Sequence, residues 1–199
     1  MMQGFAYFPA IVYRDERPDL IEEILPVCMS ELDKVRQDAI FSFIQSGHLG
    51  SDIRMQNLMQ YLLCSAVDIL RGQGYITAKY DFYFQGLWAQ ELQKNAGTNV
   101  HVHKNSQICG WMFLETPENG AYPIYYDTRS NKAMSELDYE NTGEVSNATG
   151  SIHFNNVAPG TVLFSNSWMQ HQLSNGNAQS PTRCIHFIIS HRDRQCSTC

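Results

Sequence analysis

The sequence has no excess of positive charge and no long apolar run. Its 14 lysines and arginines against 20 aspartates and glutamates leave a net charge of −6, which gives no global reason to expect binding to nucleic acid or to a membrane surface. No stretch approaches the roughly 18 consecutive apolar residues of a membrane span. The start of the chain also lacks the basic segment and apolar core of a signal peptide, so we expect a cytoplasmic protein.

Regular cysteine spacing is absent too. Six cysteines are scattered over 199 residues, so a disulfide framework is not expected. Cys196 and Cys199 form one C-x-x-C pair, which supplies at most half of a structural zinc site, and we expect a reduced terminal tail. There are no internal repeats, and a chain of this length can bury a sizeable core in one domain. The oligomeric state stays open, with a homodimer among the options.

The N-terminal third of the chain is expected to form one strand and several helices. Residues 5–13 are aromatic and β-branched, which predicts a strand. Asp19 is placed to cap a helix, and Pro26 predicts an early end or a kink. A second helix is expected over residues 30–43. Apolar residues at spacings of three and four predict a longer helix over 51–72.

Beyond residue 74 the pattern changes to short strands separated by turns. The expected strands cover residues 75–92, 99–103, 108–115, 121–127, 151–157, 161–165 and 184–190. Asn119 and Gly120 predict a hairpin turn, because these residue types accept positive φ angles at low cost. Residues 128–150 are polar throughout, and a loop of this length within a compact domain often serves as a lid.

Helices followed by short strands at this spacing predict an α+β chain. Its core would be all-β, a jelly roll or double-stranded β-helix, flanked by N-terminal helices. We expect a single domain over residues 1–199. Within it, 1–74 would pack on the core, 75–191 would form the jelly roll with a metal site, and 192–199 would be a tail.

Three histidines carry the expected chemistry. His101 and His103 are separated by one residue, so both imidazoles point the same way if the segment is a strand. With His171 they could bind iron, zinc, copper or nickel, and three protein ligands leave open positions, as a catalytic metal requires. The commoner oxygenase arrangement uses two histidines and a carboxylate. Asp127 therefore competes with His103 as the third ligand.

Arg183 and the remaining histidines are weaker candidates for the functional site. Arg183 has a planar guanidinium suited to bidentate contact with a carboxylate, so near a metal it could hold the far end of a dicarboxylate. The alternative is a solvated arginine at a strand end. His153 and His186 alternate with apolar neighbours, and we expect both to be satisfied strand histidines, not ligands. His191 is expected in a surface tail.

The run H-V-H-K-N-S-Q-I-C-G-W-M-F-L-E-T-P-E-N-G resembles the iron/2-oxoglutarate oxygenase superfamily. It is most similar to a small family, common in marine bacteria and phages, in which an H-x-H motif is followed by a strand ending in D-P-R. The similarity covers about residues 80–190, including P-G-T-V-L-F-S-N-S-W-M-Q-H-Q-L and P-T-R-C-I-H-F-I-I-S. It implies that His101 and His171 bind iron and that Arg183 pairs with the distal carboxylate of 2-oxoglutarate.

The chain also departs from that pattern. His103 replaces the aspartate or glutamate that usually serves as second ligand, Cys109 replaces a serine, and Thr128 replaces a proline. The leading hypothesis is an Fe(II)- and 2-oxoglutarate-dependent oxygenase that uses O₂, releases succinate and CO₂, and acts on an unidentified primary substrate. The alternatives are a non-catalytic jelly-roll binding module and a three-histidine metal dioxygenase that does not use 2-oxoglutarate. Beyond the metal ligands, no catalytic side chain is expected.

Overall fold

Two antiparallel sheets and two helices make up the computed structural model, which describes residues 10–36, 42–129 and 149–194. The helices are α1 (Ile21–Arg36) and α2 (Gln56–Gly72), and short 3₁₀ turns cover Pro18–Leu20, Ile53–Met55 and Thr77–Lys79. The strands are β1 (Val12–Glu16), β2 (Phe43–Gln45), β3 (Tyr80–Leu92), β4 (Ile108–Glu115), β5 (Pro123–Tyr126), β6 (Ser151–His153), β7 (Thr161–Asn166), β8 (His171–Leu173) and β9 (Thr182–Asp193).

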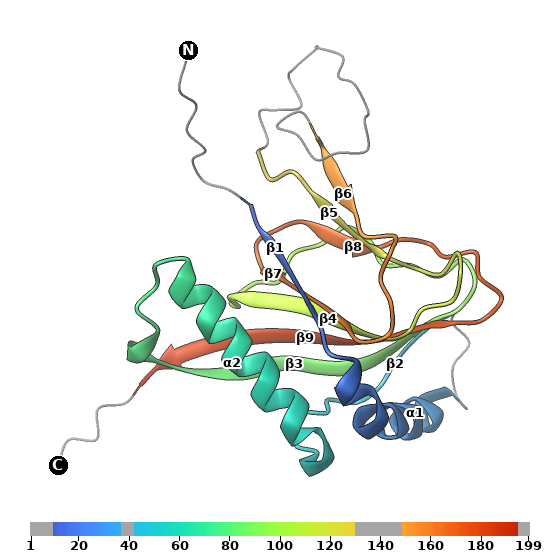
Figure 1. The fold of residues 1–199 in the computed structure, drawn as a ribbon, viewed down its shortest axis with the longest axis horizontal. Helices are drawn as coiled ribbons and strands as arrows, with labels where there is room; N and C mark the ends of the chain where they lie inside the picture. Colours follow the sequence, from blue (N-terminus) through green and yellow to red (C-terminus); the bar gives the residue numbers. More distant parts are fainter. Residues whose placement is uncertain (1–9, 37–41, 130–148, 195–199) are drawn as a thin grey trace.

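The larger sheet has the order β1-β7-β4-β9-β3-β2, and the smaller has the order β6-β5-β8. Both helices lie on one side of the larger sheet and the smaller sheet lies on its other side (Figure 1). These are the layers of a double-stranded β-helix with N-terminal helices, so the predicted fold class is confirmed.

Because both faces of the larger sheet are covered, its strands bury side chains on both sides. The core between the sheet and the helices, which we call the helical core, includes Leu87, Ile185 and Phe187. The core between the two sheets, which we call the inter-sheet core, includes Trp111 and Cys184. Neighbouring residues of a strand point to opposite faces, so successive residues of β9 alternate between the two cores.

Helix α1 corrects the expectation of two helices separated near Pro26. It runs unbroken from Ile21 to Arg36 with Pro26 inside it. Ile24, Val27 and Leu32 are buried along the same helix. Their packing against the sheet outweighs the lost hydrogen bond of a proline in a helix interior, which costs about 3 kcal/mol.

The prediction of a helix over residues 30–43 is also wrong at its C-terminal end. Phe43 begins β2, which pairs with β3 through Phe43↔Leu92 and Gln45↔Gln90. The edge of β3 offers backbone partners that a local helical pattern cannot reveal, and pairing with it determines the conformation of this segment.

Helix α2 agrees with its sequence pattern. Asp52 stands before the short 3₁₀ turn that leads into α2, and its carboxylate accepts a hydrogen bond from the backbone N–H of Arg54 at 2.9 Å. The buried face consists of Leu58, Leu62, Ala66 and Leu70, which repeat at spacings of four as an amphipathic helix requires.

The strand region follows the sequence in part. The strand expected over 99–103 is wrong, because His101 forms only an isolated bridge there, and the strands expected over 75–92 and 151–157 are shorter, at Tyr80–Leu92 and Ser151–His153.

Strand β4 has the expected bounds, and Asn119 adopts a φ of 60° in the turn that follows. Strand β9 continues to Asp193, because Asp193 pairs with Tyr80 at the start of β3. His191 is therefore not in a tail. Its ring lies 4.7 Å from that of Tyr80.

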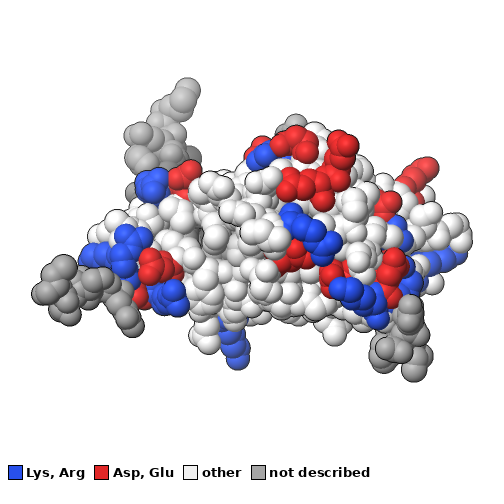
Figure 2. Space-filling view, turned by 90° about the horizontal axis from the view of Figure 1, so that it is seen from below, with Lys and Arg blue, Asp and Glu red and all other residues white. Residues whose placement is uncertain are grey.

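Several expected features lie outside the described residues. They are most of the strand expected over 5–13, the greater part of the polar loop 128–150, and the pair Cys196 and Cys199. None of the helices in the described ranges is long and apolar enough to span a membrane. On the face shown in Figure 2, acidic and basic side chains lie next to one another in several clusters, and uncharged residues cover the surface between them.

Candidate metal centre

Three histidines meet at one end of the smaller sheet. His101 and His171 form an antiparallel bridge, in which the backbone N–H of each donates to the carbonyl of the other at 3.0 and 3.1 Å. His103 follows two residues later, and its N–H donates to the carbonyl of Ser167 at 3.0 Å. One ligand atom from each imidazole lies within 4.8 Å of the others. The predicted convergence of His101, His103 and His171 is therefore present.

Backbone carbonyls fix the orientation of two of the three rings. Nδ1 of His101 lies 2.7 Å from the carbonyl oxygen of Asn99, and Nδ1 of His171 lies 2.7 Å from that of Met169. A carbonyl only accepts, so each Nδ1 carries the proton and each Nε2 keeps its lone pair. Nε2 of His171 points toward Nε2 of His103, 3.2 Å away. Such outer contacts orient a metal-binding histidine and fix its tautomer.

The surroundings of His103 and His171 keep these two imidazoles neutral. Burial first, and then the neighbouring His101, lower the pKa of His171 to about 3. The pKa of His103 is lowered to about 4, first by burial and then by His101. Neutral imidazole is the form that binds a metal ion, so His103 and His171 need no deprotonation near neutral pH.

Asp127, the competing third ligand, is oriented differently. Its carboxylate accepts hydrogen bonds from the guanidinium of Arg129, with Oδ2 2.7 Å from Nη2 and Oδ1 3.0 Å from Nε. It does not belong to the group of candidate ligands that the described residues form. The structure therefore favours the spacing argument, which selects His103, over the argument from carboxylate chemistry.

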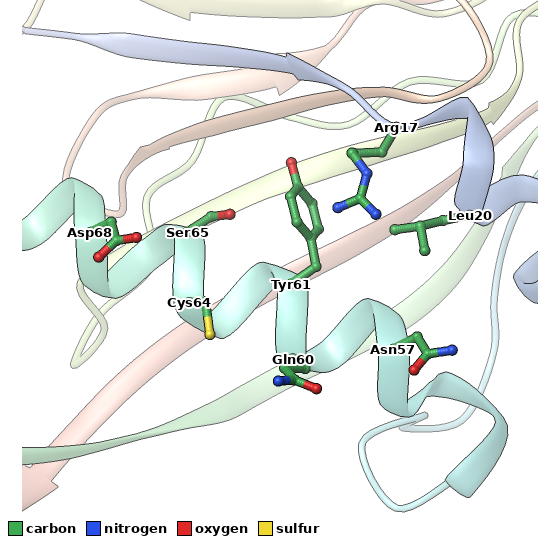
Figure 3. Close-up of a pocket in the computed structure, with 8 residues that line it drawn as sticks. All are labelled: Arg17, Leu20, Asn57, Gln60, Tyr61, Cys64, Ser65 and Asp68. Carbon is green, nitrogen blue, oxygen red and sulfur yellow. The ribbon is translucent and has the colours of Figure 1, made fainter.

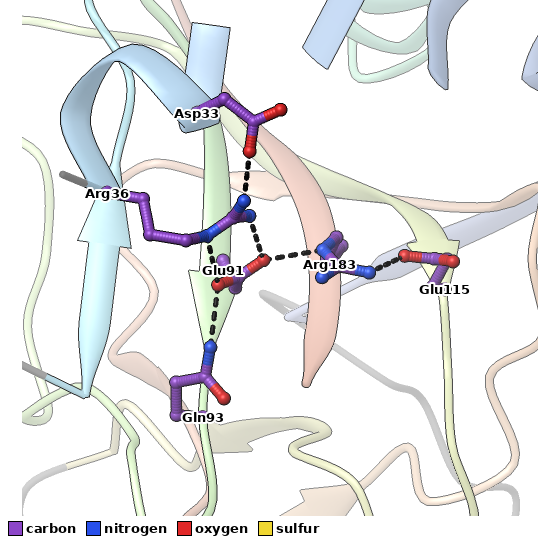
Figure 4. Close-up of polar contacts among 6 residues, drawn as sticks. All are labelled: Asp33, Arg36, Glu91, Gln93, Glu115 and Arg183. Carbon is purple, nitrogen blue, oxygen red and sulfur yellow. Dashed lines mark hydrogen bonds and ion pairs between the residues drawn. The ribbon is translucent and has the colours of Figure 1, made fainter. Parts of the chain in front are cut away.

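Arg183 is the predicted site residue that the structure does not bring to the histidines. It precedes Cys184 of the inter-sheet core and therefore points to the helical side of the sheet. Its Nε donates to Glu91 at 2.6 Å and its Nη1 to Glu115 (Figure 4). Glu91 is fully buried and also accepts from Arg36 of α1 at 2.7 Å. The guanidinium thus bridges β3, β4 and β9 on the opposite face from the histidines.

His186 is the site neighbour that the sequence interpretation missed. It was expected to be a satisfied strand histidine, but its ring lies 5.0 Å from that of His103 and is stacked on Trp111 at 5.4 Å. Its Nε2 is buried without a hydrogen-bond partner among the described residues. The register Trp111↔His186 between β4 and β9 places both rings in the inter-sheet core. The other expected strand histidine, His153, is exposed on β6.

Unpartnered polar atoms gather around the three histidines. The rings of Trp111 and Tyr125 lie 5.2 and 6.0 Å from that of His171. Within the described ranges, four buried atoms in this region have no hydrogen-bond partner: Trp111 Nε1, the Tyr125 hydroxyl, Ser167 Oγ and His186 Nε2. A buried polar group left unpaired costs about 1–3 kcal/mol, so a concentration of them beside one cluster indicates a place for a polar ligand.

A separate pocket of about 570 Å³ lies on the helical layer, away from these residues. It is formed between Arg17, Leu20 and helix α2 (Figure 3). The guanidinium of Arg17 lies 4.3 Å above the ring of Tyr61 there. None of its lining residues is a histidine, so it adds no ligand to the metal centre.

Comparison with protein families identifies the family of the chain. The 2OG-Fe(II) oxygenase family model matches residues 86–187, about half of the chain. The chain belongs to the 2OG-Fe(II) oxygenase family. It is accordingly a 2-oxoglutarate- and Fe(II)-dependent oxygenase, and its primary substrate is unknown. The resemblance to the marine and phage subgroup stays a prediction, because the family model does not test it.

Several solved structures share the fold of this chain. A prolyl-4-hydroxylase from Pseudomonas putida is 9% identical with a TM-score of 0.64, over 92% of this chain and 94% of that one. AviO1 from Streptomyces viridochromogenes Tue57 is 11% identical with a TM-score of 0.62, over 91% and 90%. HygX from Streptomyces hygroscopicus, with nickel and 2-oxoglutarate bound, is 11% identical with a TM-score of 0.60, over 91% and 83%. No curated protein sequence matches the chain significantly.

Proposed function

We propose that His101, His103 and His171 hold the Fe(II) ion of this oxygenase, and that the enzyme hydroxylates a C–H bond. The observation that carries the assignment is the meeting of three ligand atoms within 4.8 Å. In His101 and His171, Nδ1–H donates to a backbone carbonyl. The lone pair of each Nε2 is therefore available to bind the metal. Imidazole nitrogen is a suitable ligand for iron.

When iron, 2-oxoglutarate and O₂ are bound, they supply the oxidising chemistry and release succinate and CO₂. The residues of this chain bind and orient. The backbone bridge between His101 and His171 fixes their separation, while burial of His171 and Trp111 excludes water from one side of the site. Three ligands from one side leave the opposite positions open for small molecules.

A direct test is an anaerobic titration of the metal-stripped protein with Fe(II) and then with 2-oxoglutarate. The visible charge-transfer absorption of an iron–oxoacid chelate reports binding without knowledge of the primary substrate. We expect the absorption in the wild type and its loss in His171→Ala. His153→Ala is the matched control, because His153 is an exposed strand histidine outside the cluster. Iron binding without the absorption would instead favour a dioxygenase that does not use 2-oxoglutarate.

The third ligand is tested in the same titration. His103→Ala is expected to weaken Fe(II) binding strongly, whereas Asp127→Asn should leave it almost unchanged because Asp127 is paired with Arg129. The reverse order of the two variants would assign the third position to the carboxylate.

Other expectations from the sequence stay predictions. They are the cytoplasmic location, a homodimer, the absence of a nucleic-acid partner, and the pairing of Arg183 with the distal carboxylate of 2-oxoglutarate. The geometry of Arg183 argues against the last of these, since its guanidinium is held by Glu91 and Glu115.

A further inference from the structure

We propose that Trp88, His186 and Trp111 form a row of rings along which electrons pass from the protein surface to the metal centre. The row would return the centre to Fe(II) whenever 2-oxoglutarate is consumed without a primary substrate. This inference rests on the proposed function, because the oxidant arises only when iron, 2-oxoglutarate and O₂ react together.

The three rings lie side by side on neighbouring strands of the larger sheet. Strand β9 lies between β3 and β4, and His186 pairs with Trp88 on one side and with Trp111 on the other. The ring of His186 is stacked on that of Trp111, with centroids 5.4 Å apart, and it lies 5.9 Å from the ring of Trp88. These are contact distances for aromatic rings, so the row is continuous.

One end of the row reaches the clustered histidines. The ring of Trp111 lies 5.2 Å from that of His171, and the ring of His186 lies 5.0 Å from that of His103. The other end reaches the surface, because Trp88 is partly exposed whereas Trp111 is only 1% exposed. The row therefore connects the histidine cluster with water.

This difference in burial gives the transfer a direction. Indole is among the most easily oxidised side chains, and it is left with a positive charge when it gives up an electron. At Trp111 that charge is away from water, and no described residue accepts the indole proton, so the charge is costly to keep there. At Trp88 water solvates the charge and takes up the proton. An electron therefore moves from Trp88 to Trp111, with His186 as the bridge.

Tyr125 offers no comparable path. Its ring lies 6.0 Å from that of His171, and on the side away from the cluster it contacts the ring of Phe154 at 5.7 Å. A phenyl ring is much harder to oxidise than an indole. Electron transfer therefore does not continue to the surface in that direction.

Atoms and electrons balance over two passes along the row. Cleavage of 2-oxoglutarate places one atom of O₂ in succinate and leaves the other at the centre. Two electrons and two protons from water convert that atom to water and return the iron to Fe(II). In each pass Trp111 gives one electron to the centre and regains one from Trp88, which releases its proton to water. A one-electron reductant in solution, such as ascorbate, then returns an electron to Trp88, which takes a proton back.

The test maps tryptophan oxidation, so it requires no primary substrate and no measurement of turnover. The Fe(II)-loaded protein is given 2-oxoglutarate and O₂, with and without ascorbate, and peptide mass spectrometry locates the oxidised residues. The chain has three tryptophans. The third, Trp168, is 51% exposed and lies between β7 and β8, outside the row. Metal-free protein treated with hydroxyl radicals generated in solution gives the pattern that exposure alone produces.

Without ascorbate we expect the wild type to be oxidised at Trp88 more than at the more exposed Trp168, and ascorbate should suppress the product at Trp88. In Trp88→Phe the product should shift to Trp111, because a phenyl ring does not supply the electron. Trp88→Tyr should protect Trp111 again, since a phenol is readily oxidised. Trp168→Phe is the matched control and should leave the product at Trp88 unchanged.

Two outcomes would overturn the inference while leaving the proposed function intact. One is a wild type oxidised at Trp168 ahead of Trp88, as in the radical-treated protein. The other is a Trp88→Phe variant in which Trp111 gains no product. The anaerobic absorption of the iron–oxoacid chelate is recorded first for each protein, and its absence in the wild type would contradict the proposed function itself. Where a Trp88 variant lacks that absorption, the wild-type pattern with and without ascorbate decides.

Discussion

Replacement of Glu91 by glutamine is expected to destabilise the protein by about 3 kcal/mol. The Glu91 carboxylate is fully buried and accepts from Arg36 at 2.7 Å, Arg183 at 2.6 Å and Gln93 at 2.7 Å. Removing one partner from a buried ion pair costs about 3–5 kcal/mol. We take the lower end because Arg36 and Arg183 keep Asp33 and Glu115 as partners. For a chain of this size the melting temperature should fall by roughly 6–12 °C.

The same variant predicts a pH dependence with a definite sign. Burial alone would raise the pKa of Glu91, but the hydrogen bonds from Arg36 and Arg183 outweigh it and hold the pKa below its usual value. A pKa lowered on folding contributes stability that is present above the unfolded value, about 4.3 for glutamate. That stability is lost as pH falls through the folded value. The difference between wild type and Glu91→Gln should thus be largest near neutral pH and shrink in acid.

Urea unfolding followed by circular dichroism at pH 7 and at successively lower pH measures both effects. Asp68→Asn is the control, because it breaks an ion pair with Arg71 on the exposed face of α2, with both side chains more than half exposed. Such surface pairs contribute little. If Glu91→Gln cost no more than this control and showed no dependence on pH, Arg183 would not be held by Glu91. The ion pair with Glu91 would then no longer explain why Arg183 lies away from the histidine cluster.

Two further predictions concern packing and reactivity. Gly110→Ala is expected to destabilise the protein by about 1–3 kcal/mol or more, because the added Cβ would lie 1.8 Å from the carbonyl oxygen of Leu163. Thermal unfolding measures the loss. The control is Gly72→Ala, which should show no such loss because nothing lies within 4 Å of the added Cβ. Under native conditions a thiol reagent should modify the exposed Cys64 and spare the buried Cys28, whose pKa is raised to about 12 by burial. Peptide mapping that finds both modified equally would contradict the packing of α1 on the sheet.

Local patterns determined much of this protein. An apolar run bounded by turn residues gives β4 its observed limits. The turn at Asn119 follows from the tolerance of asparagine for a positive φ. Each of these features depends on neighbours within a few positions in the chain, so the sequence alone carries the information.

Which side chains of strand β9 face the site was decided only by the tertiary structure. Most residues of Thr182–Asp193 are buried on both faces, because helices cover one side of the sheet and a second sheet covers the other. Their pattern therefore does not reveal which face Arg183 shares with which partner. A shift of one residue in register exchanges the two faces. Pairing with β3 and β4 sets that register. In this register Arg183 lies beside Glu91 on the helical side, and His186 lies beside Trp111 near the three clustered histidines.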